Sequence, residues 1–279
     1  MLRGQNVRPI FMVHDLIPLS HPQFCRAGES TKHFLRLRNA MNIASGIICN
    51  SQATKDALSN LCEDNKWTPP PLTVALLAPE LPRAIPGPRP MVPPYFAIVS
   101  TIEPRKNHLM ILKIWKKLAL QLGDAVPRLV IIGQRGWDYD EVADMLAQSE
   151  TLRHLVIEIP ACSDVDMVNY LREAQALLFP SFVEGYGMPV VEALAHGVPV
   201  IASDLPVFRE FAANIPEYVS STDEAGWMQM IKNYAAVNSS HRQAQLARME
   251  GFVAPSWTGH FAQVDTLLEQ LMQNEKKRA

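Results

Sequence analysis

Two glycines stand between an apolar run and a helix start in the segment FPSFVEGYGMPVVEALAHGVPVIASD, which spans residues 179–204. The run ends at Phe179, and Pro189 marks the first turn of the expected helix, a position that proline favours. Gly185 and Gly187 permit positive φ angles and close approach to another backbone. Because the first N–H groups of a helix have no partner within it, they can bind phosphate. We therefore expect a phosphate site in this turn.

One carboxylate lies on each side of the expected phosphate site, Glu184 before it and Glu192 after it. A carboxylate does not bind phosphate, but it accepts hydrogen bonds from sugar hydroxyls. In open parallel sheets, ligands bind at the carboxyl ends of the strands, where this turn is expected. The residues predict a nucleotide-sugar site, with the diphosphate in the turn and one sugar ring at each carboxylate.

The nine residues E-G-Y-G-M-P-V-V-E resemble the E-x7-E signature of retaining GT-B glycosyltransferases, family 4 (group 1), and the chain is similar to bacterial polysaccharide mannosyltransferases. The resemblance runs in order over roughly residues 9 to 215. Four further segments share it: VHDLIPLSHP (13–22), STIEPRKNH (100–108), IIGQRGWDYDE (131–141) and SDLPVFRE (203–210). Ser100 and Gln134 depart from the Gly and Lys that are common in the family.

The resemblance implies a role for each motif residue. Glu184 would contact the hydroxyls of the donor sugar, and Glu192 would bind the ribose hydroxyls. Backbone amides would hold the sugar and the diphosphate, and these belong to Gly185, Tyr186, Gly187 and Met188.

Three further residues complete the implied site. Arg105 and Lys106 would neutralise the departing diphosphate, because preorganised cations stabilise the charge that develops in the transition state. His14, at the end of an expected strand, would point towards the donor sugar. Taken alone, Arg105 and Lys106 also suit a solvated helix start, and His14 suits a local hydrogen bond.

The implied reaction is metal-independent and needs no cofactor. It would move a sugar, mannose from GDP-mannose, to a glycan or lipid-linked oligosaccharide acceptor with retention of configuration. The family's first N-terminal strands and their Gly-rich loop, which are expected before His14, are absent from the sequence. The alternative is a non-catalytic or fragmentary nucleotide-sugar-binding protein that lacks a complete acceptor domain.

These residues need a scaffold, and short apolar runs alternate with amphipathic stretches along the chain. Unalternated strands separated by helices indicate a parallel sheet covered on both faces. The expected fold is α/β, a GT-B-type pair of Rossmann-like doubly wound domains with a truncated N-terminal one. Strands are expected at 9–14, 46–50, 73–77, 95–100, 128–133, 154–159, 177–179, 198–203 and 217–220, and helices at 29–44, 51–62, 107–122 and 256–274.

Ten of the 22 prolines fall between residues 67 and 94 and predict an extended linker, since proline disfavours helix and sheet. We expect a partial N-terminal domain with this linker, a nucleotide-sugar-binding domain, and a C-terminal docking helix with its tail. Their bounds are 1–90, 91–255 and 256–279. In the docking helix the apolar spacing places Phe261, Val264, Leu267, Leu268 and Leu271 on one side.

Other polar groups have plainer interpretations. The triplets at 138–140 and 164–166 suggest acids at helix starts rather than a metal site. His21, His108 and His196 lack partners at metal-ligand spacing. The helix at 29–44, with Lys32, His33, Arg36 and Arg38, fits either a solvated face or peripheral contact with a membrane.

Composition bounds the class of protein. Apolar residues make up 48% of the chain and charged residues 19%, which excludes a disordered protein. A formal charge of −2 gives no basic field for nucleic acid. The four cysteines form no C-x-x-C pair, and no apolar run reaches membrane-spanning length. We expect a cytoplasmic protein, with the inner face of the membrane as the place of any peripheral contact.

Overall fold

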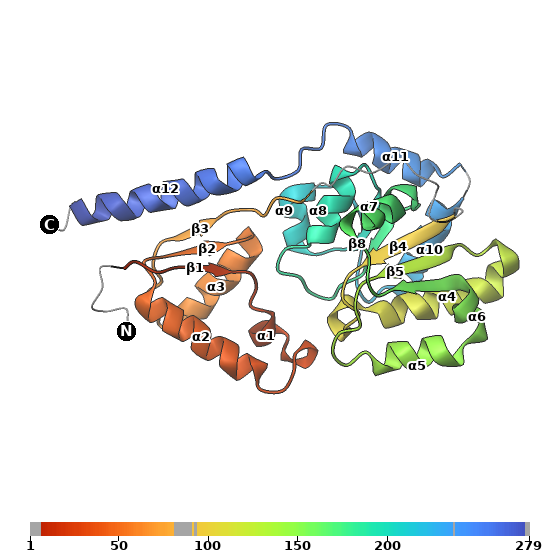
Figure 1. Cartoon of the computed structure of the whole chain (residues 1–279), viewed down its shortest axis with the longest axis horizontal. Coiled ribbons are helices and arrows are strands. Elements are labelled where there is room, and N and C mark those ends of the chain that lie inside the picture. Colours follow the sequence, from red (N-terminus) through yellow and green to blue (C-terminus); the bar gives the residue numbers. More distant parts are fainter. Residues whose placement is uncertain (1–6, 81–90, 92–93, 237, 277–279) are drawn as a thin grey trace. The chain divides into compact units, whose positions relative to one another are not determined.

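The chain folds into two compact units in the computed structural model (Figure 1). The structure describes residues 7–80, 91, 94–236 and 238–276. The first unit contains the chain up to Pro79, the turn Glu184–Gly187 and the chain from Pro255 onward; the second contains Glu80–Val183 and Met188–Ala254. The domain boundary expected at residue 90 lies outside the described residues.

The first unit is built on three parallel strands in the order β1-β2-β3. The strands are β1 (Ile10–Val13), β2 (Gly46–Cys49) and β3 (Leu72–Val74). The helices are α1 (Ile17–Ser20), the 3-10 turn η2 (Pro22–Phe24), α2 (Glu29–Ile43), α3 (Gln52–Asp64) and α12 (Trp257–Lys276). The strand expected at 73–77 is shorter, because its partner β2 ends at Cys49; the Ala75 N–H still donates to the Cys49 carbonyl at 2.9 Å.

Helix α12 docks on β2 and β3 through one row of side chains. Leu267 is only 2% exposed, and methyl groups of Leu267 and Leu271 would lie 3.2 and 3.3 Å from a Cβ at Gly46. The prediction that Phe261 and Leu268 share the buried row is wrong, since they are 56% and 39% exposed. Successive helical residues turn by about 100°, so Leu268 points to the flank of the helix when Leu267 faces the sheet. No helix within the described ranges is long and apolar enough to cross a membrane.

The second unit is a six-stranded parallel sheet in the order β6-β5-β4-β7-β8-β9. Its strands are β4 (Tyr95–Val99), β5 (Arg128–Ile132), β6 (Val156–Ile159), β7 (Leu177–Phe179), β8 (Val200–Ser203) and β9 (Glu217–Val219). Its helical segments are η3 (Pro104–Lys106), α4 (His108–Leu122), η4 (Gly123–Ala125), α5 (Asp140–Gln148), α6 (Glu150–Leu155), α7 (Asp164–Glu173), α8 (Met188–Ala195), α9 (Pro206–Ala212), α10 (Glu224–Ala235) and α11 (Ser240–Met249). The expected doubly wound architecture of this part is confirmed.

Both faces of the central strand β4 are buried, which explains its unalternated apolar sequence. On one face Phe96 packs against Trp115 of α4, with ring centroids 5.9 Å apart, in a core that also contains Trp227 of α10. On the other face Tyr95 is fully buried, and its hydroxyl donates to the Tyr170 carbonyl of α7 at 2.6 Å. The position of β4 and of its carboxyl end is therefore fixed from both sides.

The docking row of α12 can be tested with two adjacent leucines. Leu267→Ala removes a buried side chain and is expected to lower the free energy of unfolding by about 2–5 kcal/mol. Leu268→Ala, the matched control on the exposed flank, is expected to cost less than about 0.5 kcal/mol. Urea denaturation followed by tryptophan fluorescence measures both. Equal losses would contradict the docking geometry.

Candidate functional site

Two of the predicted segments follow neighbouring strands at the point where the strand order reverses. Strand β4 pairs with β7 in parallel, with Ala97 opposite Leu177, and the chain then winds outward in both directions. Residues 100–107 follow β4 and residues 180–187 follow β7. Because parallel strands share one carboxyl edge, this reversal brings the two segments together at the place where open α/β sheets bind ligands.

Asn107 fixes the turn that carries Arg105 and Lys106. Its backbone is left-handed, with φ of 58°, and its side-chain amide donates to the carbonyls of Pro180 and Ser221 at 3.2 and 2.9 Å. The Phe182 N–H donates in turn to the Arg105 carbonyl at 2.9 Å. The segment after β4 is thus bonded directly to the segment after β7.

The two cations in this turn differ in environment. The Arg105 guanidinium lies beside the Glu103 carboxylate, with 2.7 Å between Nε and Oε1. Lys106 is 8% exposed, and its ammonium lies 5.0 Å from the ring centroid of Phe179 at the end of β7. A desolvated ammonium over an aromatic face interacts more strongly with anions than one in water. Lys106 therefore places a largely desolvated ammonium group at the end of β7.

His108, which opens α4, has no access to solvent. Burial and the neighbouring Lys106 lower its pKa to about 3, so the ring is neutral at ordinary pH. Its Nε2 lies 3.3 Å from the Ser100 hydroxyl, the group that stands where the family commonly has glycine. This geometry agrees with a structural rather than a metal-binding histidine.

The E-x7-E motif crosses from the first unit to the second. Glu184 to Gly187 belong to the first unit, and Met188 opens α8 in the second. Gly187 has φ of 107°, as expected for the turn. Glu192 is the fifth residue of α8 and lies just beyond its first turn.

Glu192 is half-buried and lies in an acidic environment. Burial raises the pKa of its carboxyl above the usual value, and the charges of Asp164 and Glu80 raise it further. Asp164 opens α7 after the N-cap Ser163, whose hydroxyl accepts from the Asp166 N–H at 3.1 Å. The 164–166 triplet is therefore part of a helix start. No group of three or more potential metal ligands occurs in the described part of the chain.

Gly185 is needed for close approach to another backbone, one of the two reasons that the sequence suggested. Its φ is not in the left-handed region; instead, a Cβ there would collide with the His14 carbonyl oxygen and lie 2.7 Å from the Asp15 Cβ. Tyr186 is 5% exposed, and its hydroxyl donates to the Leu77 carbonyl at 2.6 Å. The turn is thus packed into the first unit at the carboxyl ends of β1 and β3.

The predicted residues therefore form two groups. His14, Glu184, Gly185, Tyr186 and Gly187 lie in the first unit. The residues grouped in the second unit are Arg105, Lys106, Met188 and Glu192. The His14 side chain is exposed, and its backbone carbonyl is what meets Gly185.

Sequence reasoning missed the polar residues that hold these segments. Asn107 donates to the carbonyl of Pro180, the first residue after β7, and the hydroxyls of Ser51 and Thr54 donate to the Gly185 carbonyl. The Ser-x-x-Thr spacing at the expected helix start is a capping signal. It could have marked Ser51, but no pattern reveals that a cap also reaches residue 185.

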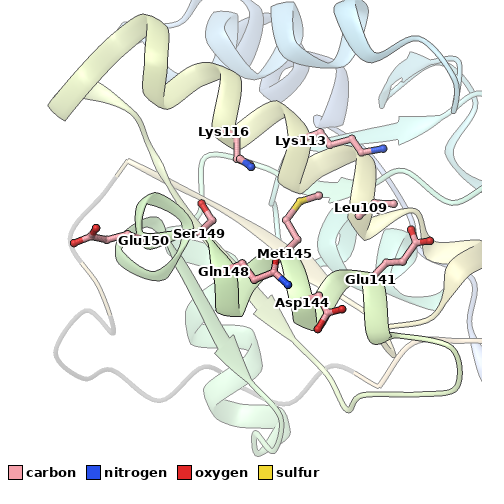
Figure 2. A pocket seen from close by; sticks show the side chains of 9 residues that line it. All are labelled: Leu109, Lys113, Lys116, Glu141, Asp144, Met145, Gln148, Ser149 and Glu150. Atoms are coloured by element: carbon pink, nitrogen blue, oxygen red, sulfur yellow. The ribbon is translucent and has the colours of Figure 1, made fainter.

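A separate hollow of about 700 Å³ lies on the second unit against α4, α5 and α6 (Figure 2). None of the predicted donor residues lines it. Its lining combines lysines of α4, acidic side chains of α5 and α6, and the apolar side chains of Leu109 and Met145. Its lining consists of Leu109, Lys113, Lys116, Glu141, Asp144, Met145, Gln148, Ser149 and Glu150.

Known proteins resemble this chain in sequence and in fold. Residues 86–216 match the family described as "Glycosyl transferases group 1". The serotype-specific mannosyltransferase WbdA of Escherichia coli is 27% identical over 252 residues, which are 85% of this chain and 31% of WbdA. The O-antigen chain mannosyltransferase RfbU of Salmonella typhimurium is 33% identical over 142 residues, which are 50% of this chain and 38% of RfbU.

Among solved structures, a mutant of S. aureus TarM in complex with Fondaparinux, alpha-GlcNAc-glycerol and UDP aligns with a TM-score of 0.67 at 14% identity. The alignment covers 96% of this chain and 51% of TarM. The chain thus spans about a third of WbdA and about half of TarM.

These matches confirm the group 1 resemblance and the GT-B-type fold, whereas family 4 membership and retention stay predictions. Residues 86–216 thus match the group 1 glycosyltransferase family, and the chain has a GT-B-type α/β architecture.

Proposed function

We propose that the chain binds a nucleotide sugar and acts in a retaining, metal-independent glycosyl transfer, with GDP-mannose as donor and a glycan or lipid-linked oligosaccharide as acceptor. The observation that carries the proposal is the bonding of the Lys106 turn to the segment that leads into E-x7-E. The Lys106 ammonium lies over Phe179 at the end of β7, and α8 begins at Met188, farther along the same segment. A cation and the N-terminus of a helix both suit an anionic diphosphate. Mannose as the sugar is supported by the names of the relatives WbdA and RfbU.

In the proposed reaction the bond between the anomeric carbon and the diphosphate oxygen breaks, and its electron pair leaves with the diphosphate. Lys106 and Arg105 stabilise that growing charge. The acceptor hydroxyl attacks the oxocarbenium-like sugar from the face that the diphosphate leaves. Its proton passes to the leaving phosphate oxygen, so the step needs no pair of carboxylates of the hydrolase kind.

Glu184 and Glu192 then act by recognition. We assign Glu184 to hydroxyls of the donor sugar, and the backbone amides from Gly185 to Met188 to the sugar and the diphosphate. We assign Glu192 to the ribose hydroxyls. Half-burial of Glu192 supports this role, because a partly desolvated carboxylate gains more from a hydrogen bond than an exposed one.

The second candidate is a nucleotide-sugar-binding protein without transfer activity. A panel of GDP-mannose, UDP-glucose and UDP-N-acetylglucosamine, scored by calorimetry and by donor hydrolysis, separates the two. Binding without turnover would favour this candidate, and binding of none would overturn both.

Substitution of the cation and the ribose carboxylate tests the site. Lys106→Ala is expected to weaken nucleotide-sugar binding by about 1.5–3 kcal/mol, because a charged hydrogen bond to phosphate is lost. Glu192→Ala should also weaken it. The matched controls Lys116→Ala and Glu141→Ala alter the hollow of Figure 2 and should bind like the parent. Parent-like affinity in Lys106→Ala or Glu192→Ala, measured by calorimetry, would refute the assignment.

Binding should depend on pH through Glu192. Its pKa is raised above 4.5, so at low pH the carboxyl is protonated and accepts hydrogen bonds poorly. Affinity for the nucleotide sugar is therefore expected to rise as pH increases from 4.5 through the raised pKa. Glu192→Gln, which stays neutral, should lose that part of the dependence. Identical pH profiles for parent and variant would contradict the ribose role.

We also propose peripheral contact with an anionic membrane through α2, at the cytoplasmic face. Arg36 and Arg38 are exposed on this helix beside Leu35 and Ile43, which are 40% and 39% exposed. Lys32 is engaged with Glu29 at 2.8 Å. Exposed arginines next to apolar side chains suit lipid phosphates above an acyl boundary, at about 1 kcal/mol for each basic residue near the surface.

Vesicle co-sedimentation measures this contact. The parent is expected to sediment with phosphatidylcholine vesicles that contain phosphatidylglycerol, and less with phosphatidylcholine alone. Arg36→Glu combined with Arg38→Glu should reduce binding at least about tenfold. The equal charge change Lys113→Glu with Lys116→Glu is the control. A similar loss in both double variants would point to net charge rather than to α2.

A further inference from the structure

A buried pair of hydroxyls holds the turn that carries Glu184. Ser51, the N-cap of α3, is fully buried, and Thr54 is 4% exposed. The Ser51 hydroxyl oxygen lies 2.9 Å from the Gly185 carbonyl oxygen, and the Thr54 hydroxyl oxygen lies 3.3 Å from it. All three residues belong to the first unit. The donor turn is therefore bonded to the start of a helix more than 130 residues earlier in the chain.

The two hydroxyls have more acceptors than hydrogens. The Ser51 hydroxyl can donate to Thr54 Oγ1, at 2.9 Å, or to Gly185; the Thr54 hydroxyl can donate to the His14 carbonyl, at 3.2 Å, or to Gly185. The Ser51 oxygen already accepts the Thr54 N–H at 3.0 Å. Both hydroxyls thus reach the Gly185 carbonyl. Removing one hydroxyl leaves His14 or Gly185 short of a hydrogen bond.

We propose that Ser51 and Thr54 are positioning residues for the donor sugar. They set the orientation of the peptide that follows Gly185, and with it the Glu184 carboxylate and the Tyr186 N–H, which we place against the donor sugar. The collision that a Cβ at Gly185 would make with His14 limits the turn on its other side. The bonded carbonyl and the close approach together restrict the movement of the turn. This assignment rests on the proposed function.

A purely structural cap is the competing explanation. Capping of α3 needs only the Ser51 oxygen as an acceptor and makes no demand on the Thr54 hydroxyl. Thr54→Val keeps the shape of the side chain and the cap, and removes the hydrogen that reaches residues 14 and 185. It is therefore the sharper substitution, and Thr54→Ser should restore the parent behaviour.

The test compares a sugar nucleotide with its nucleotide in the full chain. In calorimetry, Thr54→Val is expected to bind GDP within about twofold of the parent and GDP-mannose about tenfold more weakly, because the carbonyls of His14 and Gly185 then share one hydroxyl donor fewer. The pair UDP and UDP-glucose is measured in the same way. Ser59→Ala is the matched control: its hydroxyl donates to the Lys55 carbonyl on the same helix and does not meet the turn.

The outcomes separate this assignment from the proposed function. A parent that binds GDP-mannose or UDP-glucose while Thr54→Val binds it equally well overturns the positioning role alone. Equal weakening of nucleotide and sugar nucleotide in Thr54→Val also overturns it, since the defect then lies in the fold. A parent that binds no sugar nucleotide overturns the proposed function and this assignment with it. Selective loss with the sugar, reversed in Thr54→Ser, supports the role.

Discussion

The parallel pairing of β4 with β7 is the constraint on which the candidate site depends. Both strands are buried, so neither can slide without exposing apolar side chains on two faces of the sheet. Their carboxyl ends are thereby fixed, and so are the segments that leave them. Asn107 converts this proximity into bonding by joining its turn to Pro180 and Ser221. The position of the Lys106 ammonium beside the end of β7 follows from the strand order, because the order reverses between β4 and β7.

The turn from Glu184 to Gly187 obeys a second constraint, which comes from the first unit. Gly185 meets a backbone oxygen with no room for a methyl group, and Tyr186 reaches the chain beyond β3. A short turn is thus held by its backbone at one residue and by a side chain at the next. Recognition of a sugar needs this kind of support, since a loose carboxylate gives little selectivity.

Much of the scaffold could be predicted from sequence because apolar periodicity reports burial directly. The strands of the second unit and helices α2, α3 and α4 follow from that pattern, and helices cover both faces of the sheet as expected. The pattern failed where burial depends on a partner: it placed Phe261 and Leu268 on the docked side of α12, although a narrow sheet covers only one row. For the candidate site, motifs located Lys106 and Glu192. They could not reveal that Thr54 bonds to Gly185, because a hydroxyl and a carbonyl 131 residues apart leave no trace in local spacing.

The exposed flank of α12 affects how the chain associates in solution rather than how it folds. Trp257, Phe261 and Met272 are 45%, 56% and 60% exposed on a helix whose other side is anchored in the sheet. The rings of Trp257 and Phe261 lie 6.0 Å apart, so the apolar surface is contiguous at that end. Such a strip tends to associate with any apolar surface in solution. Self-association of this chain is therefore expected to depend on the exposed flank of α12, while the opposite flank packs on β2 and β3.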